Sequence, residues 1–173
     1  MRELYDQLLQ WAIDNALFDL HCHGPDHWKR VTRNVLFLGQ HHTFDVEVGI
    51  AFALLHDCQR EFDYGNDLHH GLRGSTCVDG LTHHPWWTLS PNQTYQVQVA
   101  CRFHTQAQPW HWFANDTTMH ACFDADRLDL VRVGIDPDSK FLFTQKAKQI
   151  ADEMSGDALE EWLTQYDYLL DNL

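Results

Sequence analysis

The sequence has none of the cysteine patterns that build a disulfide framework or a thiolate zinc site. Its five cysteines are an odd number, and no two of them are separated by just two residues. A disulfide scaffold and a C-x-x-C metal site are therefore disfavoured. We expect reduced, buried cysteines, as in a cytoplasmic protein.

Long hydrophobic runs are also absent. No stretch approaches the roughly 18 consecutive apolar residues that a membrane-spanning helix needs. The first residues, Met1–Asp6, lack the basic start and apolar core of a secretory signal peptide. These absences predict a soluble cytoplasmic protein that has no membrane partner.

Positive charge is scarce as well. The chain has 12 lysines and arginines against 25 aspartates and glutamates, which gives a formal net charge of −13. Such a surface repels a nucleic-acid duplex or an anionic membrane, so we expect neither as a partner. A small anionic substrate stays compatible, because bound divalent cations and a few arginines can reverse the sign of charge in one pocket.

The composition that remains is that of a folded helical protein. Hydrophobic residues make up 44% of the chain and include seven tryptophans and ten phenylalanines, a content that disfavours disorder. No internal repeat or linker is evident, so 173 residues predict one domain, 1–173. Helical spacing of apolar residues predicts an all-α fold. The expected helices cover 1–17, a segment from Pro25, 46–58 with Asp45 as its N-cap, part of 71–79, 93–103 after Ser90-Pro91, about 120–132, 141–154, and a last helix capped by Asp157.

The helix expected over residues 46–58 ends in an unusual pair. Its side chains are apolar almost all round, which predicts a buried helix, yet it closes on His56-Asp57. Burying ionisable groups costs free energy unless something neutralises them. A metal ion would do so, and so would an ion pair with Arg60. The dipeptide alone is weak evidence, because chance produces about one in a chain so rich in histidine and aspartate.

The context of this dipeptide is more specific. His27 lies on the apolar stripe of the helix that begins at Pro25, and Asp126 lies on a helix much further along the chain. Three helices can bring two imidazoles and two carboxylates to one cation. Such nitrogen and oxygen ligands suit divalent metals without any thiolate.

Several further stretches accompany these residues: His23–Val31, Phe52–Asp57, Asp124–Leu130, His70–Arg73, His104-Thr105 and Arg132–Ile135. Together they resemble the HD-domain superfamily of metal-dependent phosphohydrolases, and most closely its small stand-alone bacterial members. The resemblance covers about residues 18–137 and implies a compact HD-type helical bundle, with residues 1–17 and 138–173 packed on it.

The resemblance also implies a set of site residues. Asp124 and Asp126 lie about 200° apart around a regular helix, so one ion can take only one of them. Asp126 is preferred because it matches the final aspartate of the family pattern. Asp129 lies on nearly the same face and would support a ligand from behind. The ligands implied for a divalent ion (Mn, Mg, Co, Ni, Fe or Zn) are His27, His56, Asp57 and Asp126, and the residues that match a second metal or substrate position are His70 and His104.

Two arginines could bind the phosphate of a substrate. Arg60 follows the His-Asp pair by three residues, and Arg73 follows His70 by three. Guanidinium groups clamp phosphate oxygens through two parallel hydrogen bonds. The alternative for both arginines is an ion pair with a nearby carboxylate from Glu61, Asp63 or Asp67.

The segment 78–119 matches the family least and is rich in aromatic residues. Its tryptophans could form the wall of a nucleobase pocket, but ordinary hydrophobic core is the favoured interpretation. The apolar face of the C-terminal region is expected to pack on the domain, with a homodimer interface as the alternative. The tryptophans concerned are Trp86, Trp87, Trp110 and Trp112.

The resemblance and these residues together predict a metal-dependent phosphohydrolase that uses a metal-activated water. A small phosphoester, such as a nucleotide, is the substrate that the resemblance implies. Asp57 would orient or deprotonate that water. One alternative is a di-iron oxygenase on the same scaffold, in which His70 and His104 complete the second iron site. The other is a regulatory or binding module whose histidines are structural and bind no metal. Metal analysis separates the three.

Overall fold

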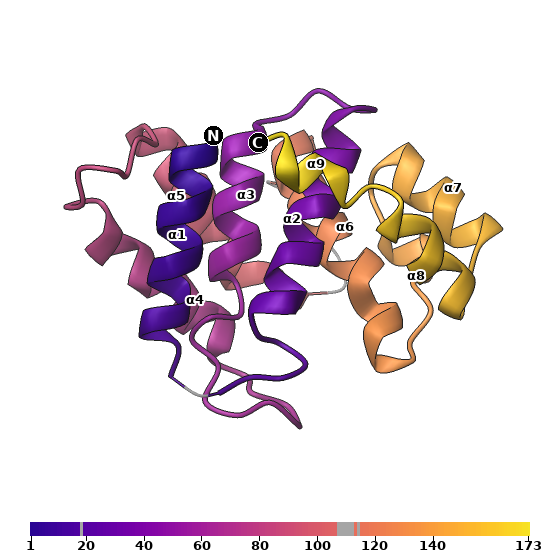
Figure 1. Ribbon diagram of the computed structural model, residues 1–173, viewed down its shortest axis with the longest axis horizontal. Coiled ribbons are helices and arrows are strands. Elements are labelled where there is room, and N and C mark those ends of the chain that lie inside the picture. The colour runs from indigo at the N-terminus through magenta and orange to yellow at the C-terminus, as the bar shows by residue number, and fades with distance from the viewer. Residues whose placement is uncertain (18, 107–112, 114) are drawn as a thin grey trace.

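The computed structural model describes residues 1–17, 19–106, 113 and 115–173, and these contain helices and no strand. The prediction of an all-α fold is confirmed. Within these ranges no helix is both long and apolar enough to cross a membrane. The helices shown in Figure 1 are α1 (Arg2–Asn15), α2 (Pro25–Gly39), α3 (Val46–Leu55), α4 (His70–Leu81), α5 (Pro91–Phe103), α6 (Thr117–Arg127), α7 (Gln145–Glu153), α8 (Gly156–Thr164) and α9 (Tyr168–Asp171), with 3-10 helices η2 (Leu128–Val133) and η3 (Ser139–Phe141).

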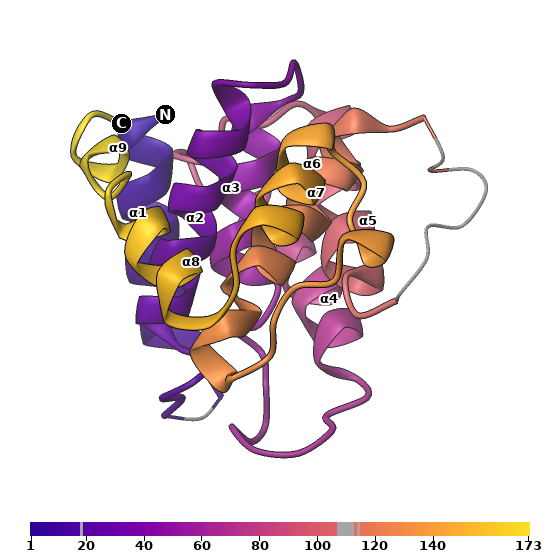
Figure 2. The same ribbon diagram turned by 90° about the vertical axis from the view of Figure 1, so that its right-hand side faces the viewer.

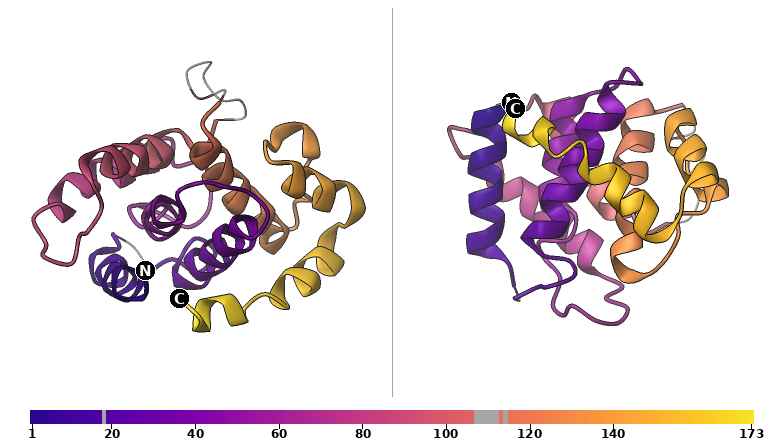
Figure 3. Two further views of the ribbon diagram at one scale, coloured as in Figure 1. Left: turned by 90° about the horizontal axis from the view of Figure 1, so that it is seen from above. Right: turned by 45° about the vertical axis from the view of Figure 1, so that its right-hand side comes forward.

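Helix α3 forms the centre of the fold. Every residue from Val48 to Leu55 is buried, as expected for a helix that is apolar all round. It contacts α1, α2, α5 and α6, and seen from above these four helices surround it (Figure 3). The end of α3, which carries His56-Asp57, is therefore held from several sides.

Local sequence signals fix the start of three helices as predicted. Pro25 stands in the first turn of α2, and the Asp45 side chain accepts a hydrogen bond from the Val48 backbone N–H at the start of α3. Ser90 and Gln93 form a reciprocal capping box at the start of α5. The Asp45 and Ser90–Gln93 contacts satisfy backbone N–H groups that a helix start leaves unpaired, whereas Pro25 has no N–H that needs a partner.

Several predicted boundaries were wrong. The helix over 46–58 ends at Leu55, and that over 120–132 changes to the 3-10 helix η2 at Leu128. The helix predicted over 141–154 starts only at Gln145, because the Thr144 side chain caps it. The last long helix, α8, begins at Gly156 and has no side-chain cap, so Asp157 does not form the predicted capping box.

The C-terminal helices form an outer layer. Helices α7 and α8 lie outside α6 (Figure 2), and α9 packs on α2. Leu159 and Leu163 of α8 are fully buried and belong to the same hydrophobic core as Leu8 of α1. Both chain ends meet there, and an Arg2 guanidinium nitrogen donates to the Asp171 carbonyl oxygen at 3.2 Å.

Candidate metal centre

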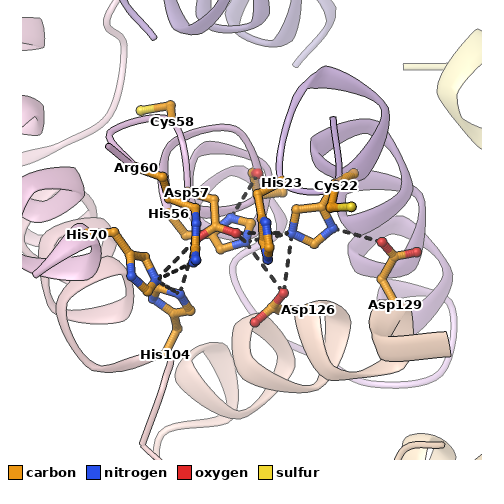
Figure 4. Close-up of polar contacts among 12 residues, drawn as sticks. Cys22, His23, His56, Asp57, Cys58, Arg60, His70, His104, Asp126 and Asp129 are labelled. Atoms are coloured by element: carbon orange, nitrogen blue, oxygen red, sulfur yellow. Dashed lines mark hydrogen bonds and ion pairs between the residues drawn. The ribbon is translucent and has the colours of Figure 1, made fainter. Parts of the chain in front are cut away.

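Three helices bring the four predicted ligands together. His27 lies in the first turn of α2, His56 and Asp57 follow the last residue of α3, and Asp126 lies near the end of α6. The Nε2 atoms of His27 and His56 are 3.0 Å apart. Asp126 Oδ1 lies 3.5 Å from the first and 3.4 Å from the second. In Figure 4, His56 and Asp57, which follow the end of α3, face Asp126 of α6.

Asp57 links this group to a second pair of histidines. Its Oδ2 lies 3.6 Å from His27 Nε2 and 3.7 Å from His56 Nε2. Its Oδ1 lies 3.2 Å from His70 Nε2 and 3.6 Å from His104 Nε2. Those two Nε2 atoms are 3.0 Å apart. Asp57, His70 and His104 therefore form a second group of the size that could hold a metal ion.

The four histidines all turn their Nε2 atoms inward because their Nδ1 atoms are engaged elsewhere. A histidine that donates from Nδ1 presents the lone pair of Nε2, which is the atom that binds metals. Two such lone pairs at 3.0 Å repel each other unless a proton or a cation lies between them. The Nδ1 partners are Asp129 for His27, the Phe52 and Ala53 carbonyl oxygens for His56, the Asp67 carbonyl oxygen for His70, and the Cys101 carbonyl oxygen for His104.

An unpaired carboxylate oxygen points to the same conclusion. Asp57 is 3% exposed, and its Oδ1 is buried with no hydrogen-bond partner. His70 Nε2 and Arg60 Nη1 lie 3.2 and 3.6 Å from this oxygen without hydrogen-bond geometry. A buried carboxylate oxygen without a hydrogen bond is costly, and a divalent cation would bind it directly. The nitrogen and oxygen donors present here fit such an ion.

The carboxylates of the cluster are ionised, as metal ligands must be. Burial would raise the pKa of Asp57, but the surrounding imidazoles, His56 foremost, outweigh burial and hold that pKa well below its usual value. The pKa of Asp126 is lowered by His56 and His27 against the same burial cost. For His27, burial lowers the pKa, but hydrogen bonds to Asp129 and Asp57 more than offset this and raise it.

Asp129 lies directly behind His27. Its Oδ2 is 2.8 Å from His27 Nδ1, and its Oδ1 accepts a hydrogen bond of 2.8 Å from Arg30. The residue is 2% exposed. A buried carboxylate in this position fixes the orientation and the tautomer of a histidine ligand.

Asp124, the competitor of Asp126, faces away from the cluster. Its carboxylate accepts hydrogen bonds from the backbone N–H groups of Phe143 and Thr144. Burial raises the pKa of Asp124 to about 6. The structure thus brings Asp126 to the histidines and uses Asp124 to hold the chain ahead of α7.

The two predicted phosphate-binding arginines differ in position. Arg60 lines the cleft above the cluster, and its Nη1 lies 3.6 Å from Asp57 Oδ1. Arg73 instead pairs with Asp67 and donates to the Gln59 carbonyl oxygen at 2.8 Å. For Arg73 the structure therefore shows the alternative predicted from the sequence, an ion pair with a nearby carboxylate.

Several residues that line the cleft were not predicted from the sequence. We call the cavity of about 250 Å³ above the cluster the metal-site cleft. His23 in its wall contacts Asp63, with His23 Nδ1 3.0 Å from Asp63 Oδ1. The stretches that carry the family resemblance include His23 and Arg132, and that was the available signal. Lining residues not assigned a site role from the sequence are His23, Thr105, Arg127, Leu130 and Arg132.

The described part of the aromatic segment 78–119 is ordinary core. Trp87 is buried, and its indole N–H donates to Thr94 Oγ1 at 3.0 Å. Trp86 is partly buried and packs against the same core. Neither lines the metal-site cleft. Trp110 and Trp112, the other two tryptophans considered for a pocket wall, lie outside the described residues.

Comparison with known proteins agrees with this architecture. No protein-family model and no curated protein matches the chain. A solved structure does match: a predicted HD superfamily hydrolase from an uncultured Thermotogales bacterium, with a TM-score of 0.65 and 23% sequence identity. The match covers 99% of this chain and 92% of that one. The chain therefore has an HD-domain fold.

Proposed function

We propose that this protein is a divalent-metal-dependent phosphohydrolase acting on a small phosphoester. The observation that carries the proposal is the convergence of four imidazole Nε2 atoms on the shared carboxylate of Asp57. The HD-domain fold supports it, since the similar structure is described as a predicted HD superfamily hydrolase. Nucleotides are the first substrates to try.

The donor atoms of the ligands that we propose for the first ion lie close enough together to bind one cation. A divalent cation bound there would lower the pKa of a water molecule that it binds and would polarise a phosphoryl oxygen. Asp57, His70 and His104 would hold a second ion, since their donor atoms also lie within reach of one another. The proposed ligands of the first ion are His27, His56, Asp57 and Asp126.

The chain contributes orientation and charge. Asp57 is buried and its pKa is held below the usual value, so its carboxylate would stay ionised and fix the direction of an attacking water. Asp129 keeps His27 in place through the 2.8 Å contact to Nδ1. Arg60, on the cleft wall, would stabilise negative charge that develops on the phosphoryl oxygens.

A di-iron oxygenase is the second candidate, and the His70–His104 pair is the observation that favours it. Two groups of donors that share one carboxylate would suit two irons. Under this alternative the purified protein contains two irons per chain, consumes O₂ only with its substrate, and loses that activity when His104 is replaced.

The test combines metal analysis with a substrate panel. Protein purified without chelator is analysed for metals, then assayed for phosphate release from nucleotides and sugar phosphates with Mn, Mg, Co or Ni. We expect release with the wild type and at least about a 100-fold loss in Asp57→Asn. Asp152→Asn, an exposed aspartate on α7, is the control. Bound metal without turnover refutes the hydrolase but not the site. Absence of stoichiometric metal favours a binding module.

A further inference from the structure

Arg132 presents a guanidinium group to the metal-site cleft that the proposed function has not yet used. It lies on η2, and its side chain is 9% exposed. Its Nε donates to the Cys22 carbonyl oxygen at 2.8 Å, and its Nη1 donates to the Asp129 carbonyl oxygen at 2.9 Å. Among the described residues its Nη2 has no hydrogen-bond partner.

The other two arginines of the cleft are more fully engaged. Arg60 donates to the carbonyl oxygens of Phe62 and Gly65, and its Nη1 faces His70 and Asp57. Arg127 uses both terminal nitrogens. Its backbone acceptors are the carbonyl oxygens of His104, Gln106 and Phe141. Within the described chain, Arg132 is the cleft arginine that keeps a whole terminal nitrogen for a ligand.

The anchors of Arg132 hold it beside the proposed metal ligands. Cys22, which accepts from Arg132, has its own N–H bonded to Asp63 Oδ2 at 2.9 Å. Asp129, the other anchor, contacts His27. The guanidinium is thus fixed between two segments before any ligand arrives, which lowers the entropy lost on binding.

The size and charge of the cleft restrict what Arg132 can bind. A volume of about 250 Å³ is smaller than the roughly 300–1,000 Å³ of pockets that enclose whole organic ligands, so it suits a phosphoryl group with the rest of the substrate outside. A phosphomonoester offers three non-bridging oxygens and close to two negative charges. A diester offers two oxygens, one charge, and a second substituent that needs room in the cleft.

We propose that Arg132 Nη2 binds a non-bridging oxygen of a terminal phosphate, so that the enzyme selects dianionic phosphomonoesters over phosphodiesters. This inference rests on the proposed function and names the substrate class of the same site. Arg132 acts here as a specificity-determining residue that contacts the substrate.

The kinetic test uses Mn²⁺-loaded protein with p-nitrophenyl phosphate and bis(p-nitrophenyl) phosphate. We expect kcat/KM to favour the monoester by about 100-fold or more. Arg132→Gln should raise KM for the monoester about 10- to 100-fold, the range for a lost hydrogen bond to a charged group, and should reduce the preference. Arg102→Gln, which removes an equal charge from the exposed surface of α5, should behave as wild type.

A binding measurement separates this inference from the proposed function. Inorganic phosphate is titrated calorimetrically into the Mn²⁺-loaded wild type, Arg132→Gln, Arg132→Lys and Arg102→Gln. We expect about 10-fold weaker binding to Arg132→Gln and an intermediate value for Arg132→Lys, which keeps the charge and guards against misfolding of the first variant. If nothing is hydrolysed but phosphate binding still depends on Arg132, the hydrolase fails and the phosphate site stands. Wild-type KM and phosphate affinity in both Arg132 variants, or preference for the diester, overturns the inference.

Discussion

At the residue scale, the second nitrogen of each histidine decides what the site can bind. Three of the four histidines, His56, His70 and His104, donate from Nδ1 to backbone carbonyl oxygens. A side-chain substitution does not remove a backbone carbonyl. His27 differs, because its Nδ1 contacts a side chain, Asp129. That makes the His27 ligand the one whose orientation can be altered by a single conservative substitution.

Asp129→Asn should therefore weaken metal binding. The neutral amide accepts the His27 Nδ1 hydrogen bond less strongly and loses the charge that increases the basicity of Nε2. We expect about a 10- to 100-fold lower Mn²⁺ affinity in calorimetric titration, with little change in helix content. Asp152→Asn is the matched control. Equal affinity in wild type and Asp129→Asn would show that the contact plays no part in metal binding.

Asp63 holds the segment that carries His23 in the wall of the cleft, and its contribution to stability should depend on pH. Burial would raise its pKa, but the backbone N–H groups of Cys22, His21 and His23, together with the His23 ring, outweigh burial and lower the pKa. A lowered pKa means that the carboxylate stabilises the fold at neutral pH and that this contribution is lost as pH falls through the folded-state pKa.

Asp63→Asn should accordingly cost about 1–3 kcal/mol in the free energy of unfolding at neutral pH, since it weakens several charge-assisted hydrogen bonds. The difference from wild type should shrink as pH falls below about 4, the ordinary aspartate pKa, because the unfolded carboxylate then binds a proton before the native one does. Urea unfolding across this range measures it. A difference that is constant with pH would mean that the charge on Asp63 does not matter.

At the scale of the helices, close backbone packing connects α4 to the metal centre. A Cβ at Gly74 would lie 2.9 Å from the Leu55 carbonyl oxygen and 3.1 Å from that of His56. Backbone atoms cannot rotate aside as side chains can. Gly80, on the same helix, has nothing within 4 Å of the position of a Cβ.

Gly74→Ala should destabilise the protein by about 1–3 kcal/mol, typical of overpacking, and should weaken Mn²⁺ binding because the displaced backbone carries His56. Gly80→Ala should leave metal binding unchanged and stabilise by up to about 1 kcal/mol through helix propensity. Urea unfolding and metal titration of both variants check this pair. If the two alanines behave alike, the approach of α4 to the His56 backbone is not tight.

The helices also show what the sequence could and could not predict. Starts set by local side chains, such as Asp45 for α3, were predicted correctly because cap and helix are adjacent in the chain. The start of α7 was predicted too early although its cap, Thr144, is local. The contact of Asp124 with the N–H groups of Phe143 and Thr144 could not be predicted, because it spans 19 and 20 residues. The position of Arg132 in the cleft wall was missed because its Cys22 partner is 110 residues distant.

At the scale of the whole molecule, charge is divided unevenly. The chain carries a formal charge of −13, yet three arginines line a single small cleft. An acidic exterior discourages polyanions from binding, while a cleft with three arginines against two aspartates would attract a small anion. The uneven charge therefore favours a small phosphate compound over a nucleic-acid duplex.

Metal binding should stabilise the whole fold, and this stabilisation should depend on pH. Although burial lowers the pKa of His27, Asp129 and Asp57 raise it above its ordinary value of 6.5 in the metal-free protein. Protonation of His27 thus stabilises the metal-free fold at low pH, and that contribution is lost as pH rises through the raised pKa. A protonated imidazole cannot bind a cation, so the metal competes with this proton.

Thermal unfolding of chelator-treated protein, with and without Mn²⁺, measures this competition. At about pH 8, Mn²⁺ at 100 times its Kd should add about 2.7 kcal/mol to the free energy of unfolding. At about pH 5.5 the gain should be much smaller, because His27 is then protonated. Asp57→Asn, which lacks the shared carboxylate, should gain little at either pH. Equal stabilisation of the wild type at both pH values would mean that the cation does not compete with the His27 proton, and would place the Mn²⁺ elsewhere on the protein.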